Sequence, residues 1–188
     1  MARPLSEEKR EGLLSSAAQL IAIQGIGAST AKIAKDAGVA EGTLFTYFAT
    51  KDELLNELFV GIETSLAEAI AASRMAGGPR ARVHAIWESL IEWGLAHPVW
   101  RRAMRQLKVS DRITDASRWR CDALFRNARG IIEQSLAEHS DPRRASFYIE
   151  TLLFGLADIT MEAIETSPKD RRRFSEAAFD LFWKGTSA

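Results

Sequence analysis

Residues 28–55 read ASTAKIAKDAGVAEGTLFTYFATKDELL, and this stretch has the pattern of short helices joined by turns. Ser29 is a good N-cap for a short helix whose apolar side includes Ile33, and Gly38 is positioned to end that helix. A further short helix is expected over about residues 41–48. Two short helices joined by a turn at a glycine predict a helix-turn-helix.

The residues of the second short helix suit contact with DNA. The second helix of such a pair enters the major groove, where its N-terminal residues meet base edges. Gly42 lets the backbone approach closely, and the Thr43 hydroxyl can serve a phosphate or a base. Tyr47 lies one turn further on, within reach of the sugar-phosphate backbone, while Leu44 and Phe48 face a small three-helix core. The alternative is a helical hairpin that only packs in a core, with Tyr47 half-buried.

A longer helix follows at once. Thr50 and Glu53 form a capping box, with Thr50 as the N-cap and Glu53 three residues on. Lys51 stands in the first turn, where its ammonium adds to the backbone N–H groups and the helix dipole to bind a phosphate. In the alternative interpretation, Lys51 is merely solvated.

The rest of the chain has the pattern of further helices. A first helix is expected between the N-cap Ser6 and Gly25, and the helix that begins after Thr50 is expected to end at Gly77-Gly78-Pro79. The remaining helices are expected over about 80–96, 98–109, 113–138, 142–165 and a last one after a Ser167-Pro168 cap. The fold class is therefore all-α with about nine helices: a helix-turn-helix DNA-binding domain over 1–50 and a larger effector-binding and dimerisation domain over 51–188.

Composition limits the classes of function. The 188 residues carry 25 basic and 25 acidic side chains, so DNA binding must depend on local placement of charge. The single cysteine, Cys121, fits a reducing cytoplasm, and neither a signal-peptide pattern nor an apolar run of membrane-spanning length is present. No nucleotide-binding loop, metalloprotease, serine-hydrolase or Cys-x-x-Cys motif occurs, and the three histidines lack metal-ligand spacing. We therefore expect a cytoplasmic protein without catalytic residues, metal or cofactor.

The stretch 28–55 resembles the signature of the TetR family of transcriptional regulators. The shared pattern is Ser or Thr before an Ile-Ala helix, then Ala-Gly-Val, Gly-Thr-Leu, Tyr-Phe and Lys-Asp-x-Leu, and the resemblance covers about residues 6–60. It implies phosphate contacts by Ser29 and Lys51 and DNA contacts by Thr43 and Tyr47. The C-terminal two-thirds resembles the family only in helical architecture.

Three residues depart from the family pattern. Ala40 replaces the usual Ser or Thr, which costs the recognition helix its side-chain N-cap, about 1 kcal/mol of local stability. Glu41 would repel phosphate unless it accepts a hydrogen bond from a cytosine amine, and Phe45 replaces a Tyr but keeps an apolar surface for a thymine methyl. The candidate DNA-binding residues are Ser29, Ala40, Glu41, Gly42, Thr43, Phe45, Tyr47 and Lys51.

Four of the five tryptophans lie between residues 87 and 119. In proteins resembling this one, the middle helices enclose a small-molecule pocket, for which aromatic rings are suitable walls. The alternative is ordinary core packing. The candidate pocket residues are Trp87, Leu90, Trp93, Trp100, Met104 and Trp119.

The last two helices carry more apolar and small residues than one packing partner requires. In the resembling family these helices pair with their copies in a second subunit, which implies an isologous homodimer. Asp158 and Glu162, four residues apart, are expected at the rim of that interface, although the polar end of the pocket is an alternative. The candidate interface residues are Phe147, Gly155, Asp158, Glu162, Phe174, Ala178 and Leu181.

The resemblance implies a repressor that binds a palindromic double-stranded DNA operator as a dimer and is released by a small, largely apolar effector. The alternative is an architectural or adaptor DNA-binding protein without a small-molecule effector.

Overall fold

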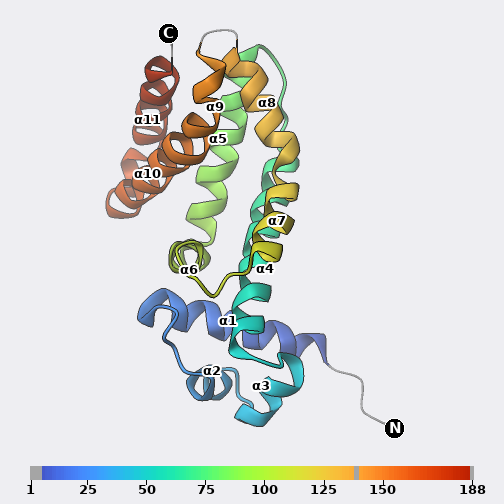
Figure 1. Ribbon diagram of the computed structural model, residues 1–188. Helices are drawn as coiled ribbons and strands as arrows, with labels where there is room; N and C mark the ends of the chain where they lie inside the picture. Colours follow the sequence, from blue (N-terminus) through green and yellow to red (C-terminus); the bar gives the residue numbers. More distant parts are fainter. Residues whose placement is uncertain (1–5, 138–139, 187–188) are drawn as a thin grey trace. The chain divides into compact units, whose positions relative to one another are not determined.

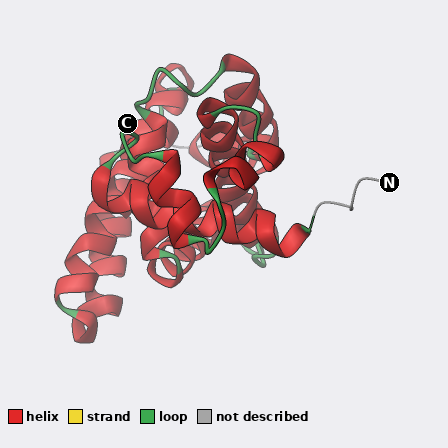
Figure 2. Ribbon diagram, turned by 90° about the horizontal axis from the view of Figure 1, so that it is seen from below, coloured by secondary structure: helices red, strands yellow, loops and turns green. Residues whose placement is uncertain are grey.

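The computed structural model describes residues 6–137 and 140–186 and is all-α over these ranges, with helices joined by loops and no strand (Figure 2). The chain divides into two compact units. The first combines the chain up to Thr64 with His97–Asp122, and the second combines Ser65–Ala96 with the chain from Ala123 onward.

The first unit contains the N-terminal helices and a later segment that includes α6 and most of α7 (Figure 1). Its elements are α1 (Glu7–Gln24), α2 (Thr30–Asp36), α3 (Glu41–Tyr47), the first part of α4 (Lys51–Ala71), α6 (Pro98–Lys108) and most of α7 (Asp115–Leu124). The predicted caps of α1 are confirmed: Ser6 Oγ accepts from the Lys9 amide, and Gly25 ends the helix at φ +74°.

The core of the first unit is built from the apolar faces that the sequence pattern indicates. Leu44 and Phe48 are buried as expected, and they join Leu13, Ile33 and Leu54 in that core. Because α6 packs on α1, residues 97–122 belong to this unit although they come later in the chain. The compact units thus follow a different boundary from the predicted functional domains 1–50 and 51–188, which remain a prediction.

The second unit is organised around α5 (Pro79–Ala96), which packs against three other helices. These are α8 (Arg126–Ala137), α10 (Phe154–Thr166) and α11 (Arg171–Gly185). The buried Trp87 indole donates to Ser175 Oγ at 2.9 Å, and that hydroxyl donates to Glu88 Oε1 at 2.7 Å. This chain of hydrogen bonds joins α5 to α11 and satisfies polar groups that burial would otherwise penalise.

Two of the expected long helices are interrupted. The helix expected over 113–138 is divided at Phe125, whose carbonyl accepts the first hydrogen bond of α8, from Arg129, and no Gly or Pro marks this break. The helix expected over 142–165 is a succession of elements instead of one regular helix. It consists of a 3₁₀ turn (Pro142–Arg144), α9 (Ala145–Phe147), a π-helical segment (Tyr148–Leu153) and α10.

The cap expected at Ser167 is also different. Pro168–Asp170 form a 3₁₀ turn before α11, and the Ser167 side chain makes no capping hydrogen bond. The break expected between residues 96 and 98 is observed: His97 is the N-cap of α6, and Pro98 occupies the first position of that helix. The His97 ring stacks on Trp100 with centroids 4.8 Å apart, so this residue also packs.

Candidate DNA-reading surface

The turn between α2 and α3 is set by local hydrogen bonds. Ser29 Oγ accepts from the Lys32 amide at 3.3 Å and caps α2. At the other end of α2, Gly38 adopts φ +70°, a conformation that L side chains rarely take, and the Val39 amide donates to the Ala34 carbonyl at 2.9 Å. This geometry reverses the chain so that α3 packs on α2, which is the helix-turn-helix arrangement.

The first turn of α3 is held by a contact that the sequence pattern does not reveal. Ala40 is the N-cap and makes no side-chain capping bond, as its methyl group requires. Glu41 Oε1 accepts from Thr30 Oγ1 at 2.6 Å, which ties the start of α3 to the start of α2. One carboxylate oxygen of Glu41 is therefore occupied within the protein, and this interaction competes with the expected contact to a cytosine amine.

The two sides of α3 differ sharply in exposure. Leu44 is fully buried, whereas Glu41, Gly42 and Phe45 are exposed, the last at 44%. Thr43 is half-buried at the edge of this face. Residues at spacings of three and four lie on one side of a helix, so the exposed residues form a single surface available to a groove.

Thr46 belongs to the same exposed side of α3, although sequence reasoning did not select it. It is exposed, and its hydroxyl donates to the Gly42 carbonyl at 3.1 Å. Its spacing of four from Gly42 was the available signal. A Thr hydroxyl that donates to the backbone keeps an acceptor site for a DNA amine.

Tyr47 has a structural role in addition to any contact with DNA. It is half-buried, and its hydroxyl oxygen accepts from the Ser6 amide at 3.0 Å. The ring thus joins the end of α3 to the N-cap of α1. The phenolic proton is still available to donate to a phosphate.

The capping box at the start of α4 is confirmed, with one difference. Thr50 Oγ1 accepts from the Glu53 amide at 3.1 Å, and Glu53 Oε2 accepts in return from the Ala49 amide at 2.7 Å. The return bond therefore reaches the residue before the cap. Its effect is the same, because two backbone donors at the helix start are satisfied.

Lys51 lies beside a second cation that comes from the loop after α6. Burial and the nearby Arg112 guanidinium lower the pKa of Lys51, and Asp52 opposes this change. Arg112 Nη1 donates to Asp52 Oδ1 at 2.6 Å. Asn56 fixes the loop, because its amide donates to the Arg112 carbonyl at 2.9 Å and its oxygen accepts from the Thr114 amide at 2.9 Å. Two positive side chains thus flank the first turn of α4.

The predicted pocket residues fall into both units. Trp87, Leu90 and Trp93 are buried on α5, and the Trp93 indole donates to Ser65 Oγ at 3.1 Å. Trp100 is half-buried on α6. Trp119, on α7, is 72% exposed, which does not suit a residue that encloses a ligand.

The sixth candidate, Met104, is buried on α6 in the first unit. For Trp87, complete burial and the bond to Ser175 favour the alternative of core packing.

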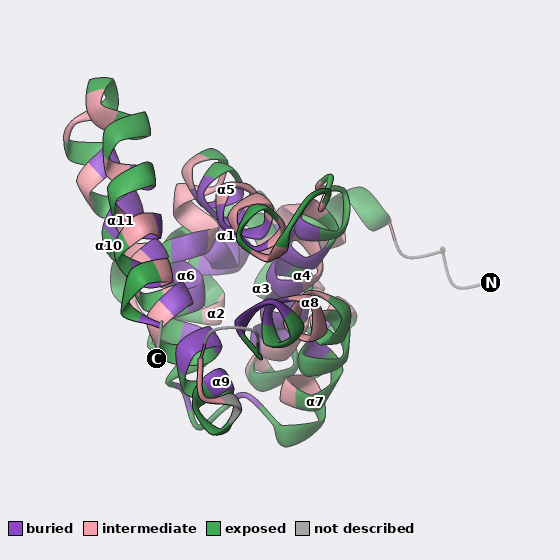
Figure 3. Cartoon of the chain, turned by 90° about the horizontal axis from the view of Figure 1, so that it is seen from above, coloured by how far each residue is buried: buried purple, intermediate pink, exposed green. Residues whose placement is uncertain are grey.

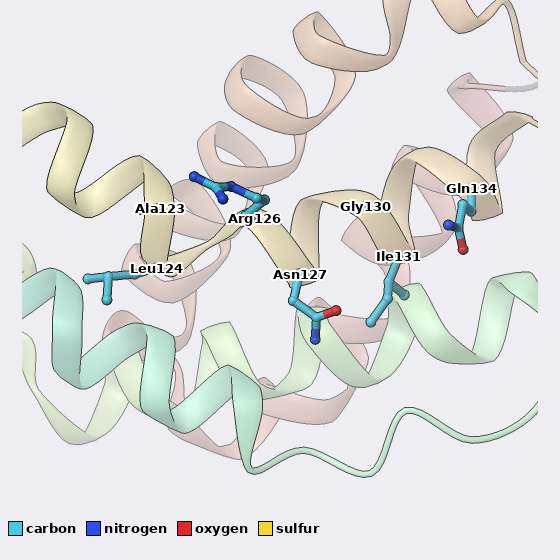
Figure 4. A pocket seen from close by; sticks show the side chains of 7 residues that line it. All are labelled: Ala123, Leu124, Arg126, Asn127, Gly130, Ile131 and Gln134. Atoms are coloured by element: carbon cyan, nitrogen blue, oxygen red, sulfur yellow. The ribbon is translucent and has the colours of Figure 1, made fainter.

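One open groove of the second unit runs along α7 and α8 (Figure 4). In that view Asn127 and Ile131 point to one side of α8 and Arg126 points to the other. The lining of this groove includes none of the six residues predicted for the effector pocket.

The predicted interface residues lie on α9–α11, where buried and exposed positions alternate (Figure 3). Phe147, Gly155 and Leu181 are exposed, whereas Phe174 and Ala178 are half-buried. Of the two acidic residues, Asp158 is half-buried and Glu162 is exposed. Ile159, which was not selected, is 66% exposed and lies one turn after Gly155.

Among the residues that the structure describes, no group of three or more His, Cys, Asp or Glu side chains is arranged to hold a metal ion. Within the same residues, no helix combines the length and the apolar character that crossing a membrane requires. Cys121 is buried. Its burial, and to a smaller extent the negative charge of Glu63, raise the pKa of its thiol to about 12.

The fold and the exposed face of α3 define a helix-turn-helix DNA-binding protein. Residues 13–58 match the bacterial regulatory proteins of the tetR family. A solved structure from Shewanella sp. PV-4, assigned to the TetR family of transcription regulators, is 27% identical, covers 96% of this chain and 98% of its own, and superimposes with a TM-score of 0.83. The chain is a TetR family transcriptional regulator.

More distant proteins share the fold. A TetR family regulator from Marinobacter aquaeolei VT8 is 21% identical over 96% of each chain, with a TM-score of 0.80. The regulator LfrR from Mycobacterium smegmatis, solved in complex with proflavine, is 18% identical over 96% of this chain and 98% of its own, with a TM-score of 0.70. The nucleoid occlusion factor SlmA of Mannheimia succiniciproducens is 32% identical over 77 residues, which is 40% of this chain and only 36% of that protein.

Proposed function

We propose that the chain is a ligand-responsive repressor that binds a palindromic operator as a homodimer and acts in the cytoplasm. The observation that carries the proposal is the exposed side of α3, followed directly by the two cations at the start of α4. A face that reads bases requires neighbouring positive charge to hold the phosphates, and Lys51 is the side chain proposed for this, since the Arg112 guanidinium is paired with Asp52. The DNA contacts proposed are those of Ser29, Glu41, Gly42, Thr43, Phe45, Tyr47 and Lys51, with Ala40 at the helix start.

The homodimer is proposed from the exposed apolar side chains of α9–α11. Phe147, Ile159 and Leu181 are large, apolar and mostly exposed in the single chain. A second copy that covers them would bury apolar surface at about 25 cal/mol per Å². Two reading helices related by a two-fold axis require an operator with the same symmetry, which is why a palindrome is expected.

A small, largely apolar effector is proposed for the helices of the second unit. LfrR, which has the same fold, has been solved with proflavine bound, and this supports a small-molecule effector in a protein of this architecture. Leu90 and Trp93 on α5 are our main candidates for contact with the effector, because both are buried. Trp119 is too exposed to enclose a ligand. Effector binding would shift the population of conformers that differ in affinity for the operator.

Selection of binding sites from genomic fragments tests the proposal. Fragments bound at moderate salt should share a short palindrome, and a transcription reporter placed behind it should be repressed until an effector is added. Enrichment without any palindrome would contradict the dimeric repressor. A palindrome with an activated reporter would contradict repression but not DNA reading.

The second candidate function is an architectural or adaptor DNA-binding protein without an effector. The similarity to SlmA favours it, because that protein is named for nucleoid occlusion. A panel of apolar compounds separates the two candidates. A repressor should lose its operator with at least one compound class, whereas an architectural protein should keep the complex and occupy many sites.

A further inference from the structure

A groove of about 430 Å³ lies in the first unit between α1, α4 and α6. This volume is within the range of small-molecule sites in proteins. Part of its wall is apolar and is formed by Leu14, Leu58, Ile62 and the half-buried Trp100. All these residues belong to one compact unit, so the groove lies within the unit that also contains α3.

The polar part of the groove is predominantly acidic. Glu7, Glu11 and Glu57 contribute three carboxylates against the single guanidinium of Arg10. Arg10 is engaged by two of them, with Nη2 at 2.7 Å from Glu57 Oε2 and Nη1 at 3.4 Å from Glu7 Oε1. The excess negative charge lies beside apolar surface, which favours a cation and disfavours an anion of the same shape.

Gly61 leaves one side of the groove open. A Cβ atom added to this residue would meet no heavy atom within 4 Å outside its own helix, and Gly61 is exposed. The position can therefore accept a side chain that occupies the groove without disturbing the core. Glycine within a helix is otherwise less favourable than alanine.

We propose that this groove binds a lipophilic cation, with an apolar body against Leu58 and Ile62 and its positive charge towards the carboxylates of Glu11 and Glu57. Trp100 adds an aromatic ring, which attracts cations through its π face. The site lies on α1, α4 and α6 of the first unit, whereas the effector is proposed for the helices of the second unit, and Trp100 is here assigned to the groove instead of the effector pocket.

Occupancy of the groove would act on the reading helix through Arg10. The Arg10 guanidinium lies 5.6 Å from the centre of the Phe48 ring, and the amide of Ser6, the N-cap of α1, donates to the Tyr47 hydroxyl. A bound cation competes with Arg10 for Glu57 and loosens this connection. This consequence for DNA rests on the proposed function, whereas binding of the cation does not.

Calorimetric titration of the full chain without DNA tests the site. Tetraphenylphosphonium is the probe, and tetraphenylborate, which has the same shape and the opposite charge, is its matched control. The phosphonium should bind at least tenfold more tightly than the borate. Equal affinities would overturn the proposal, because the carboxylates would then have no influence.

Variants locate the bound probe. Gly61→Leu should reduce phosphonium affinity at least tenfold and Gly61→Ala should not, with both variants folded by circular dichroism. Glu11→Gln, an isosteric change at the surface, should weaken binding about fivefold, the effect of one nearby charge in a partly solvated site. Phosphonium binding that is unchanged in both Gly61→Leu and Glu11→Gln would place the probe elsewhere and overturn the proposal. Failure to find an operator would leave these titrations unaffected.

Discussion

The helix α3, which we propose reads DNA, and the helices α9–α11 both expose large apolar side chains, but in different settings. On α3, Phe45 stands among polar neighbours such as Glu41 and Thr46. On α9–α11, Phe147, Ile159 and Leu181 are accompanied by exposed small residues such as Gly155. A single apolar group among polar ones suits a thymine methyl, whereas apolar groups repeated along helices suit packing against other helices.

An exposed apolar residue can be interpreted only together with its neighbours. Phe45 belongs to a helix of seven residues that is held by Leu44 in the core and by the Glu41–Thr30 bond. The α10–α11 pair has its own core contacts through Phe179 and Phe182, and it still presents a second apolar side.

The largest effect is expected from charge on the α10–α11 surface. Leu181→Glu and Ile159→Glu each place a carboxylate where a partner helix would pack, and burial of such a charge is costly. The chain should become monomeric by light scattering, and operator affinity should fall about 100-fold because two linked half-sites are no longer engaged together.

Val109→Glu is the matched control for these two variants, because Val109 is also apolar and is 84% exposed at the C-cap of α6. It should leave both the mass and the affinity unchanged. A Leu181→Glu and Ile159→Glu double variant that remains dimeric would show that the interface lies elsewhere.

Lys51→Gln is expected to weaken binding to every DNA sequence by about tenfold and to reduce the salt slope by about two, because each of the two protomers loses one phosphate contact. Fluorescence anisotropy at several salt concentrations measures both quantities. Lys169→Gln removes the same charge from an exposed turn of the second unit and should change neither. A slope identical to that of the original chain would remove Lys51 from the contact set.

Phe45→Ala is expected to alter preference at one base pair and not overall affinity. Loss of an apolar contact to a thymine methyl should reduce discrimination there by about fivefold, the lower part of the range for a base contact. Phe45→Leu should retain most of the preference. Competition with operators changed at each position gives the measurement, and a uniform loss across all positions would contradict the assigned role.

The smallest effect is expected from Ala40→Ser, which restores a side-chain cap at the start of α3. The backbone of Ala40, at φ −69° and ψ 148°, already has the extended conformation of an N-cap. A gain of about 1 kcal/mol at most would raise the melting temperature by about 2–4 °C in a chain of this size. Ala40→Val, which lacks the hydroxyl, should give no gain in calorimetry.

Much of the first unit could be predicted from local pattern. The caps at Ser6, Ser29 and Thr50, the glycine turn at Gly38 and the burial of Leu44 are all observed. These features depend on residues three or four apart, whose interactions are dictated by helix geometry alone. They are accessible without knowledge of any distant partner.

Long-range partners could not be predicted in the same way. The bond from the Ser6 amide to Tyr47, the Thr30–Glu41 contact and the support of Arg112 by Asn56 join residues 11 to 56 positions apart. Each changes the interpretation of a candidate DNA contact. No helical period relates such positions, so only the packed structure brings them together.

The chain's own pattern of caps, glycines and apolar spacing therefore determined that it is all-helical and that α2 and α3 form a helix-turn-helix. Tertiary packing decided that α6 joins the first unit and that the tryptophans are distributed between two units, while no local pattern indicated that residues 148–153 are π-helical. The physical reason is that hydrogen bonds within a helix are short-range in sequence. The choice of packing partner instead depends on which apolar faces meet after the helices have formed.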